Sequence, residues 1–423
     1  MAVLGFALAA VAVLALLVLV HRYVWRRLVG DTTTAGSMPR RAGTVAAYVL
    51  PLLSVGALVS GRTGTPFWLQ QVLAWPGYLW LAALLYLTLA LLAGELVRPL
   101  LSRLLARRAE RYPVGAVAAE PVTAAHGSTV TTTAPPPAAP LAATPDPAAP
   151  SRRLFVARAV GGAAVVAGLG TTGYGAYGVL RGPRVKRVAV PLARLPRSAH
   201  GFRIAVVSDI HLGPVLGRAH TQRIVDAVNR TQPDLIAVVG DLVDGSVEDL
   251  GPAAEPLARL RSRHGAFFVT GNHEYYSGAT EWVDHVRELG LHPLENARVE
   301  IDGFDLAGVN DIAGESEGQG PDFGRALGDR DRTRAAVLMA HQPVVIDEAV
   351  EHGVDLQLSG HTHGGQLWPG NHIAELSNPT VAGLERYGDT QLYVTRGAGA
   401  WGPPVRVGAP SDITVVELAS RQA

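Results

Sequence analysis

Side chains that can bind metal ions follow a series of short apolar segments in the second half of the chain. These segments lead into Asp209 and His211, Gly240-Asp241, Asn272-His273-Glu274, His341, and His361 with His363. Carboxylate, amide and imidazole groups are oxygen and nitrogen ligands, which suit divalent Mn, Fe, Zn or Co. A pair of such ions lowers the pKa of a shared water and holds the oxygens of a phosphate group. The pattern therefore favours hydrolytic metal chemistry.

Each of these groups also has an ordinary structural interpretation when it is taken alone. A D-x-H pair is usually a surface feature, and Gly-Asp after a strand is common turn chemistry. The segment Gly360-His361-Thr362-His363 is more specific, because two histidines two residues apart and surrounded by glycines suit a loop wrapped around an ion. All five groups in one order, each closing an apolar segment, favour one shared site.

The apolar segments read as strands of a layered α/β domain. Short runs rich in β-branched residues alternate with amphipathic segments, which is typical of strands that alternate with helices. The predicted strands are 203–208, 234–239, 266–270, 304–309, 335–340, 355–359, 391–395 and 413–418, and the predicted helices are 220–230, 252–263 and 280–289. Sites in such folds form where the carboxyl ends of strands meet, so we expect the metal-binding groups to converge.

The order of these motifs resembles that of the calcineurin-like metallophosphoesterase superfamily over roughly residues 203–420. The motifs are D-x-H, G-D-x-x-D, G-N-H-E, a single His and G-H-x-H. AHQP at 340–343 and GHTHGGQ at 360–366 look most like the bacterial membrane-anchored branch. The resemblance implies a layered β-sandwich flanked by helices. GNHE replaces the GNHD often seen in the family, which leaves the role of Glu274 open.

The resemblance also implies a role for each matching residue. It assigns Asp209, His211 and His363 to one metal, Asn272, His341 and His361 to a second metal, and Asp241 to a bridge between them. His273 would stand beside the leaving group and supply its proton, as histidine can near neutral pH. The implied activity is hydrolysis of phosphate esters or phosphodiesters by a metal-activated hydroxide.

Several neighbouring residues keep two interpretations. Asp244 is either a carboxylate that orients a metal ligand or a helix N-cap. Asn310 and Asp311 are either substrate-side residues or turn residues. The histidines that match no motif, such as His220, are expected to be packing or surface residues.

Composition separates the chain into two halves. Cysteine is absent, which excludes disulfides, thiolate metal sites and cysteine nucleophiles. Residues 1–199 hold 20 Lys and Arg against 5 Asp and Glu, whereas residues 200–423 hold 17 against 31. The acidic second half argues against a nuclease and against nucleic acid as a partner, because such binding depends on Lys and Arg contacts with phosphates.

The basic first half reads as a membrane region with four apolar spans. Three lie within residues 1–112, at about 2–20, 42–60 and 73–93, and the fourth runs from about 159 to 180 in the segment 151–182. Each is long enough to cross a bilayer. Residues 113–150 are rich in Ala, Pro and Thr and are expected to form a flexible linker, and the phosphoesterase-like domain is expected over 200–423.

Arginine-rich loops predict the orientation of the chain. The 21–41 and 94–158 loops carry many arginines, which favours placing them in the cytoplasm and the catalytic domain outside it. Ser151-Arg152-Arg153-Leu154-Phe155 resembles a twin-arginine export signal, although these arginines could also be ordinary flanks of a span. We therefore expect a multi-pass cell-membrane protein whose partners are the membrane, a phosphorylated small-molecule or lipid-linked substrate, and the twin-arginine export machinery.

Overall fold

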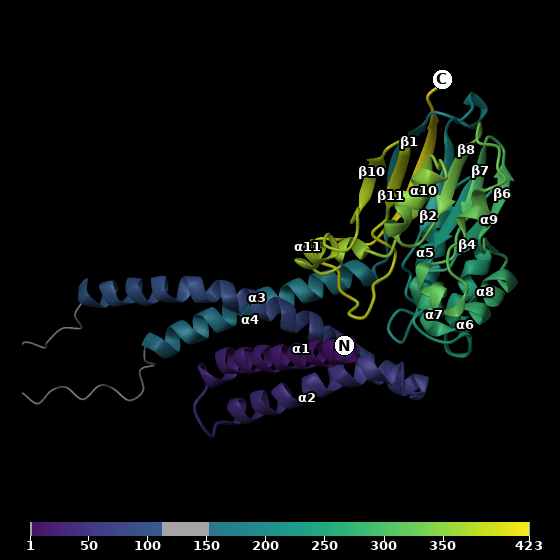
Figure 1. Ribbon diagram of the computed structural model, residues 1–423. Coiled ribbons are helices and arrows are strands. Elements are labelled where there is room, and N and C mark those ends of the chain that lie inside the picture. Colours follow the sequence, from purple (N-terminus) through teal and green to yellow (C-terminus); the bar gives the residue numbers. More distant parts are fainter. Residues whose placement is uncertain (1, 112–151, 423) are drawn as a thin grey trace, which may run out of the picture. The chain divides into compact units, whose positions relative to one another are not determined.

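The computed structural model describes residues 2–111 and 152–422 (Figure 1). The predicted linker at 113–150 lies outside the described residues. Contacts divide the chain into two units, one formed by Met1–Val45 with Leu87–Gly168 and the other by Ala46–Tyr86 with Leu169–Ala423. The second unit contains the predicted catalytic domain.

Long apolar helices form the first part of the chain. They are α1 (Ala2–Trp25), continued by the π-helix η1 (Arg26–Gly30), then α2 (Met38–Ser60), α3 (Phe67–Arg111) and α4 (Arg152–Leu180). Among the described residues, α2, α3 up to Arg108, and α4 are long and apolar enough to cross a membrane. A helix suits this environment because it satisfies its backbone hydrogen bonds internally. The predicted span at 2–20 lies within α1, and the total of four spans stays a prediction.

Two six-stranded sheets make up the core of the second unit. The first sheet has the order β1-β12-β2-β3-β4-β5 and the second has the order β10-β11-β9-β8-β7-β6. The strands of the first sheet are β1 (Arg184–Leu192), β12 (Asp412–Ser420), β2 (Phe202–Val207), β3 (Leu235–Val239), β4 (Ala266–Val269) and β5 (His292–Pro293). Those of the second sheet are β10 (Gly383–Tyr387), β11 (Thr390–Val394), β9 (Leu356–Ser359), β8 (Ala335–Met339), β7 (Phe304–Gly308) and β6 (Ala297–Ile301).

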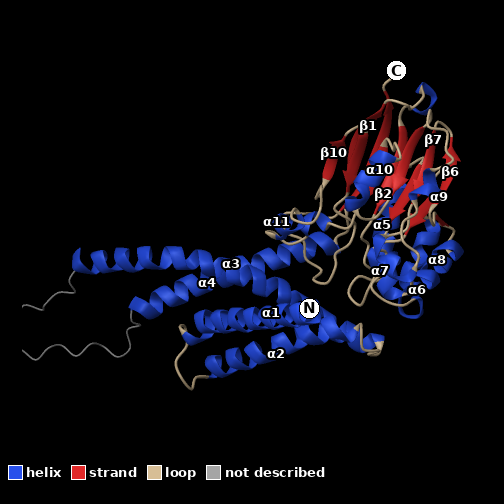
Figure 2. Ribbon diagram, viewed as in Figure 1, coloured by secondary structure: helices blue, strands red, loops and turns tan. Residues whose placement is uncertain are grey.

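The inner faces of the two sheets share one apolar core. Val206 and Val239 from the first sheet and Val337 and Leu358 from the second belong to the same cluster of fully buried side chains. Period-two alternation along each strand sends the other side chains to the outer faces, where helices cover them. Figure 2 shows the strands in red and these helices in blue.

Helices cover the outer face of each sheet. On the first sheet, Ile224 of α5 (Arg218–Thr231), Leu250 of α6 (Val247–Ala254) and Trp282 of α8 (Ala279–Glu288) are buried together with Val238. The corresponding cover of the second sheet comes from α9 (Phe323–Leu327) and α10 (Ile346–Glu351). The remaining short elements are η2 (Arg197–Ala199), η3 (Glu255–Arg259), α7 (Asn272–Ser277), η4 (Ile312–Glu317), η5 (Pro343–Val345), η6 (His363–Gly365) and α11 (Gly370–Ala374).

This architecture confirms the predicted layered β-sandwich with flanking helices. All eight predicted strands are present, and β1, β5, β6 and β10 are additional. The predicted helix at 252–263 instead begins earlier, as α6 followed by η3, because Ser246 caps its first turn by accepting the N–H of Asp249. The connection at 181–202 contains β1, which pairs in parallel with β12 along nine residues.

Candidate metal centre

The candidate metal-binding side chains follow the carboxyl ends of five strands. Asp209 comes two residues after β2, Asp241 two after β3 and Asn272 three after β4. His341 and His361 come two residues after β8 and β9. Within each sheet these strands run in parallel, so their carboxyl ends meet at one edge. The two sheets thus bring their ligand-bearing loops together.

The backbone of these loops takes up an unfavourable conformation. Asp209, His211, Asp241, His361 and His363 all have positive φ, between 49° and 71°. Residues other than glycine rarely occupy this left-handed region, and such strain clusters at functional sites. The surrounding sandwich therefore stabilises a local geometry that aims these five side chains at one point.

Two glycines make room for the carboxylates. A Cβ atom built on Gly271 would collide with the carboxylate of Asp241, and a Cβ atom on Gly360 would collide with that of Asp209. These glycines are needed for space, since the neighbouring loop lies directly against them.

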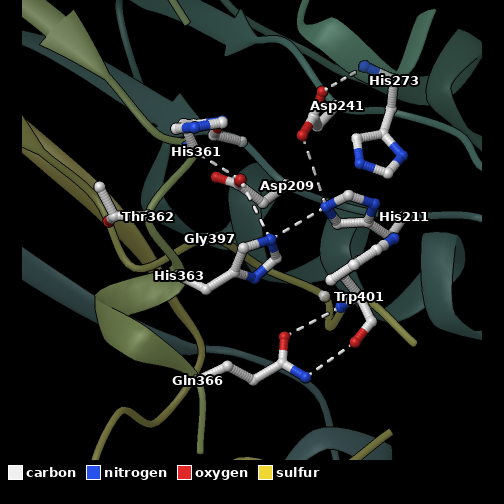
Figure 3. A network of polar contacts seen from close by, with 12 residues as sticks. Asp209, His211, Asp241, His273, His361, Thr362, His363, Gln366, Gly397 and Trp401 are labelled. Carbon is white, nitrogen blue, oxygen red and sulfur yellow. Dashed lines mark hydrogen bonds and ion pairs between the residues drawn. The ribbon is translucent and has the colours of Figure 1, made fainter. Parts of the chain in front are cut away.

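The first group of side chains consists of Asp209, His211 and His363. Their ligand atoms lie within 4.8 Å of one another, and all three residues are buried. The Nε2 atoms of His211 and His363 face each other at 3.0 Å, and His363 Nε2 lies 3.4 Å from Asp209 Oδ1 (Figure 3). The Oδ2 atom of Asp209 is buried and has no hydrogen-bond partner among the residues that the structure describes. Converging lone pairs with an unpartnered oxygen fit a cation.

The second group consists of Asp241, His341 and His361, whose ligand atoms also lie within 4.8 Å of one another. His341 Nε2 is 3.1 Å from Asp241 Oδ2 but has no hydrogen-bond partner within residues 2–111 and 152–422, and His361 Nδ1 is 3.0 Å from Asn272 Oδ1. Asp241 also faces the first group, because its Oδ2 lies 3.7 Å from His211 Nε2. One carboxylate is thus placed between the two groups.

Asp244 connects two histidines of the site. Its Oδ1 lies 2.9 Å from His211 Nδ1 and 2.6 Å from His273 Nδ1. Burial disfavours the charge of Asp244, but the charges and hydrogen bonds of the two histidines outweigh burial and lower its pKa to about 2. Of the two interpretations that the sequence left open, the structure favours the orienting carboxylate, since Ser246 caps the following helix.

Glu274 fixes the loop that carries Asp241. Its buried carboxylate accepts hydrogen bonds from the backbone N–H groups of Asp241, Leu242 and Gly271, at 3.0, 2.7 and 2.6 Å. Burial, followed by the charge of Asp241, raises the pKa of Glu274 to about 7. The side chain therefore joins the loops after β3 and β4.

His273 lies at the open side of the site. Its backbone N–H donates to Asp241 Oδ1 at 2.9 Å, and its side chain is 17% exposed. Its ring is flanked by the rings of Tyr276 and Trp401, with centroid distances of 5.4 and 5.9 Å. This position lets a bound molecule reach the imidazole, while Asp244 contacts its Nδ1 atom.

Arg406 is a site residue that the sequence analysis missed. It is buried and donates from Nη1 to the carbonyl oxygen of His363 and from Nη2 to its Nδ1, at 3.0 and 2.8 Å. Arg406 therefore fixes the orientation of His363. No motif contains it, and only its position after the 397–405 loop brings it to this histidine.

Other candidates have structural partners. Asn310 and Asp311 form turn hydrogen bonds with Gln319 and Ala313, as in the alternative interpretation of these residues. His220 is buried in α5, away from the two ligand groups. Gln366 hydrogen-bonds both backbone groups of Trp401, at 3.0 and 2.9 Å, and so fixes one wall beside His273 (Figure 3).

Comparison with known proteins gives a family match in the same region. Residues 202–365 match the model of the calcineurin-like phosphoesterase family. An uncharacterized metallophosphoesterase of Aquifex aeolicus is 35% identical over 240 residues, which cover 56% of this chain and 91% of that protein. The family match at 202–365 includes all five strands that lead into the two ligand groups.

Two further relatives are longer proteins. A transmembrane protein with a metallophosphoesterase domain from Danio rerio is 39% identical over 259 residues, covering 58% of this chain and 59% of that protein. An uncharacterized metallophosphoesterase of Helicobacter pylori is 38% identical over 247 residues, covering 58% and 66%. The match thus spans less than two thirds of the length of these two relatives.

Proposed function

The chain belongs to the calcineurin-like phosphoesterase family, and on this basis we propose that it is a membrane-anchored phosphoesterase with two divalent metal ions. Its reaction would be the hydrolysis of phosphate esters or phosphodiesters. Support comes from the three helices that are long and apolar enough to span a membrane and from the two ligand groups that share Asp241.

Seven residues would hold the metals. The first ion would be bound by Asp209, His211 and His363, and the second by Asn272, His341 and His361, with Asp241 shared by both. The unpartnered atoms of Asp209 and His341 support this assignment. Oxygen and nitrogen ligands of this kind accept Mn, Fe, Zn or Co. When bound, such ions polarise a phosphate group and lower the pKa of water.

The remaining side chains would orient the metal ligands or transfer a proton. Asp244 holds His211 and His273 through one oxygen, which sets the ring orientation of both. His273 is the group placed to donate a proton to the leaving oxygen, because it reaches the open side of the site. Arg406 and Glu274 keep His363 and the Asp241 loop in position.

One observation carries this proposal: the Asp241 carboxylate lies within 3.1 Å of His341 and 3.7 Å of His211. The test is metal-dependent release of nitrophenol from nitrophenyl phosphomonoesters and phosphodiesters by the full chain in detergent. We expect Asp241→Ala to lower kcat/KM by more than about 100-fold. Loss of a residue that only orients a metal ligand typically lowers activity by about 10–100-fold, and Asp241 would itself be a ligand. The matched control is His372→Ala, at an exposed histidine in α11. Equal activity in the wild type and Asp241→Ala would refute the mechanism.

We also propose that the substrate is a phosphorylated small molecule or a lipid-linked phosphate. The support is the closeness in sequence of α4 to the catalytic domain, which starts four residues after α4 ends. Nucleic acid is not expected as a substrate, because residues 200–423 carry 17 basic against 31 acidic side chains and no lysine.

The proposed location is the cell membrane, with several spans and the catalytic domain outside the cytoplasm. Support comes from the arginines of the 21–41 and 94–158 loops, which favour the cytoplasm. Use of the twin-arginine export machinery is part of this proposal and rests on the sequence at 151–155. A reporter that works only outside the cytoplasm, fused after Ala423, should be active. Activity of a reporter that works only in the cytoplasm would contradict this orientation.

A further inference from the structure

A cavity of about 190 Å³ lies where the end of α4 meets the catalytic domain. It is several times larger than the roughly 30 Å³ that one water occupies in the liquid. Its walls come from the last turns of α4, the connection to β1 and the 406–411 segment, and its side chains are those of Tyr174, Tyr177, Arg181, Arg184, Arg406, Pro410 and Ser411. We call it the α4 pocket. None of the proposed metal ligands lines it.

The α4 pocket is positively charged. Three of its lining residues are arginines, and no carboxylate is among them. Arg181 and Arg184 form no ion pair within the part of the chain that the structure describes. Arg181 instead lies over the ring of Tyr177, 5.8 Å from its centroid. Guanidinium groups without a carboxylate partner are suited to bind a phosphate through paired N–H donors.

The carboxylate next to the pocket is already engaged. Asp412 follows Ser411 in the chain, but it is buried and lies 3.2 Å from Lys186 Nζ and 3.9 Å from Arg396 Nη1. It also accepts a hydrogen bond from Thr395. The charge of Asp412 is thus balanced elsewhere, so the excess of positive charge in the pocket remains.

Arg406 is a buried cation in the wall of the α4 pocket. Its donors are bonded to the carbonyl oxygens of Gly399, Ala409 and His363 and to His363 Nδ1. These bonds use four of the five guanidinium N–H groups, so Arg406 attracts an anion mainly through its charge, and Arg181 and Arg184 are placed to make the direct contacts.

The side chains around the pocket suit a membrane surface. α4 is one of the helices long and apolar enough to span a bilayer, and the pocket lies at its carboxyl end. Tyr174 and Tyr177 are 72% and 63% exposed. Tyrosine is enriched at the level of the lipid headgroups, and arginine at the end of a span extends toward them.

We propose that the α4 pocket binds a phosphate anion, carried by the headgroup of an anionic phospholipid or free in solution, at a site separate from the metal centre. The exposed tyrosines and the position at the end of α4 favour the lipid. The site also gives a role to the arginines at 181 and 184, which run against the charge bias expected for an external loop.

The test compares two variants of the full chain in detergent with the same change in charge. Arg181→Gln/Arg184→Gln removes the direct contacts, and Arg187→Gln/Arg197→Gln removes two exposed arginines that do not line the pocket. Native mass spectrometry measures binding of phosphatidylglycerol and of zwitterionic phosphatidylcholine. We expect the wild type and the control variant to bind one phosphatidylglycerol tightly, and the pocket variant to bind it at least about tenfold more weakly.

A second arm identifies the source of the phosphate. Inorganic phosphate is titrated into each protein with a chelator present, so that the metal centre does not contribute to binding. Weak phosphate binding together with strong lipid binding in the wild type would identify the headgroup, and strong phosphate binding that the pocket variant loses would identify the free anion. Equal binding of both probes by the pocket and control variants, with both still folded by thermal unfolding, would refute the site.

Discussion

Single residues of the site act through their neighbours as much as through their own chemistry. Asp244 is the clearest example, because one oxygen contacts both His211 and His273. A group that orients a metal ligand typically contributes 10–100-fold to metal affinity. Under the proposed mechanism Asp244 would therefore influence two steps, the binding of metal and the transfer of a proton.

For Asp244→Asn we expect weaker metal binding by about 10–100-fold and a lower kcat even at saturating metal. The amide keeps the shape of the side chain but loses the negative charge that orients both histidines. Competition with a chelating dye measures the first effect, and turnover of a nitrophenyl phosphoester at saturating metal measures the second. If only metal affinity falls, the contact with His273 is dispensable.

His220 allows a test of stability against pH. Its ring is buried without a hydrogen-bond partner among the described residues, and burial, followed by the charges of Arg223 and Arg406, lowers its pKa to about 3. The unfolded chain binds a proton at this histidine near pH 6.5, whereas the folded chain does not. The stability that depends on neutral His220 is therefore present above pH 6.5 and is lost as the pH falls toward 3.

Between pH 7 and pH 5 this linkage costs the wild type about 2 kcal/mol. His220→Leu should remove the cost, so its melting temperature should fall over that range by about 4–8 °C less than that of the wild type. Thermal unfolding at both pH values provides the measurement, with His372→Gln at an exposed position as the control. An identical pH dependence in wild type and His220→Leu would show that the ring can be protonated in the folded chain.

At the residue scale, the sequence is informative where a ligand closes a buried strand. Asp209, Asp241 and His341 could be found in this way because the strand fixes where the next side chain points. Arg406 and the role of Glu274 could not be found, since each depends on a loop that comes from a different strand. Such contacts follow from the packing of the sandwich and leave no local pattern.

At the scale of the elements, the central strands were predictable and the edge strands were not. β3 and β8 are buried along their whole length, so they consist of apolar residues. β1 has the sequence RVKRVAVPL and is exposed over much of its length, so it reads as a basic tether. Charged residues and proline are typical of edge strands, because they discourage pairing with other chains.

β1 should nevertheless be required for a stable domain. Val190 and Leu192 are buried in the core between the sheets, beside Val416 and Leu418 of β12. A fragment beginning at Gly201 leaves β12 as an exposed edge and removes these side chains, which we expect to cost several kcal/mol. A fragment beginning at Gly182 is the control.

Size-exclusion chromatography and thermal unfolding of the two fragments measure this difference. We expect the longer fragment to be monomeric and the shorter one to aggregate or to melt at a clearly lower temperature. Two fragments of the same stability would mean that β1 packs on the domain without supporting it.

For the whole molecule, metal should link the two sheets. Each ligand group combines residues from both sheets, because His341, His361 and His363 follow strands of the second sheet and the other ligands follow strands of the first. Ions that bind only the folded chain stabilise it by about 2.7 kcal/mol each at 100 times their dissociation constant. Removal of metal should therefore lower the melting temperature of the catalytic domain by several degrees.

Thermal unfolding of the full chain with and without a chelator measures this effect. Asp241→Ala should melt at the same temperature in both conditions, because it has lost the shared ligand. A shift of equal size in both proteins would place the stabilising ions outside the two ligand groups.

At this scale, the sequence predicted the division into a helical part and an α/β part, since charge and hydropathy differ so clearly between the halves. It did not predict β1, because this strand begins soon after α4 and carries the basic residues expected of a loop. Hydropathy distinguishes a span from a domain, but it does not mark a strand that is exposed on one side.

The connection between α4 and β1 is only three residues long. Within it, Arg181 and Gly182 donate backbone hydrogen bonds to Tyr177 and Val179, so the turn is itself folded. A connection this short keeps β1, the first strand of the catalytic domain, close in sequence to the end of α4. If α4 spans a membrane as proposed, a substrate that diffuses within the same lipid layer would reach the enzyme at a higher local concentration than a solute in bulk.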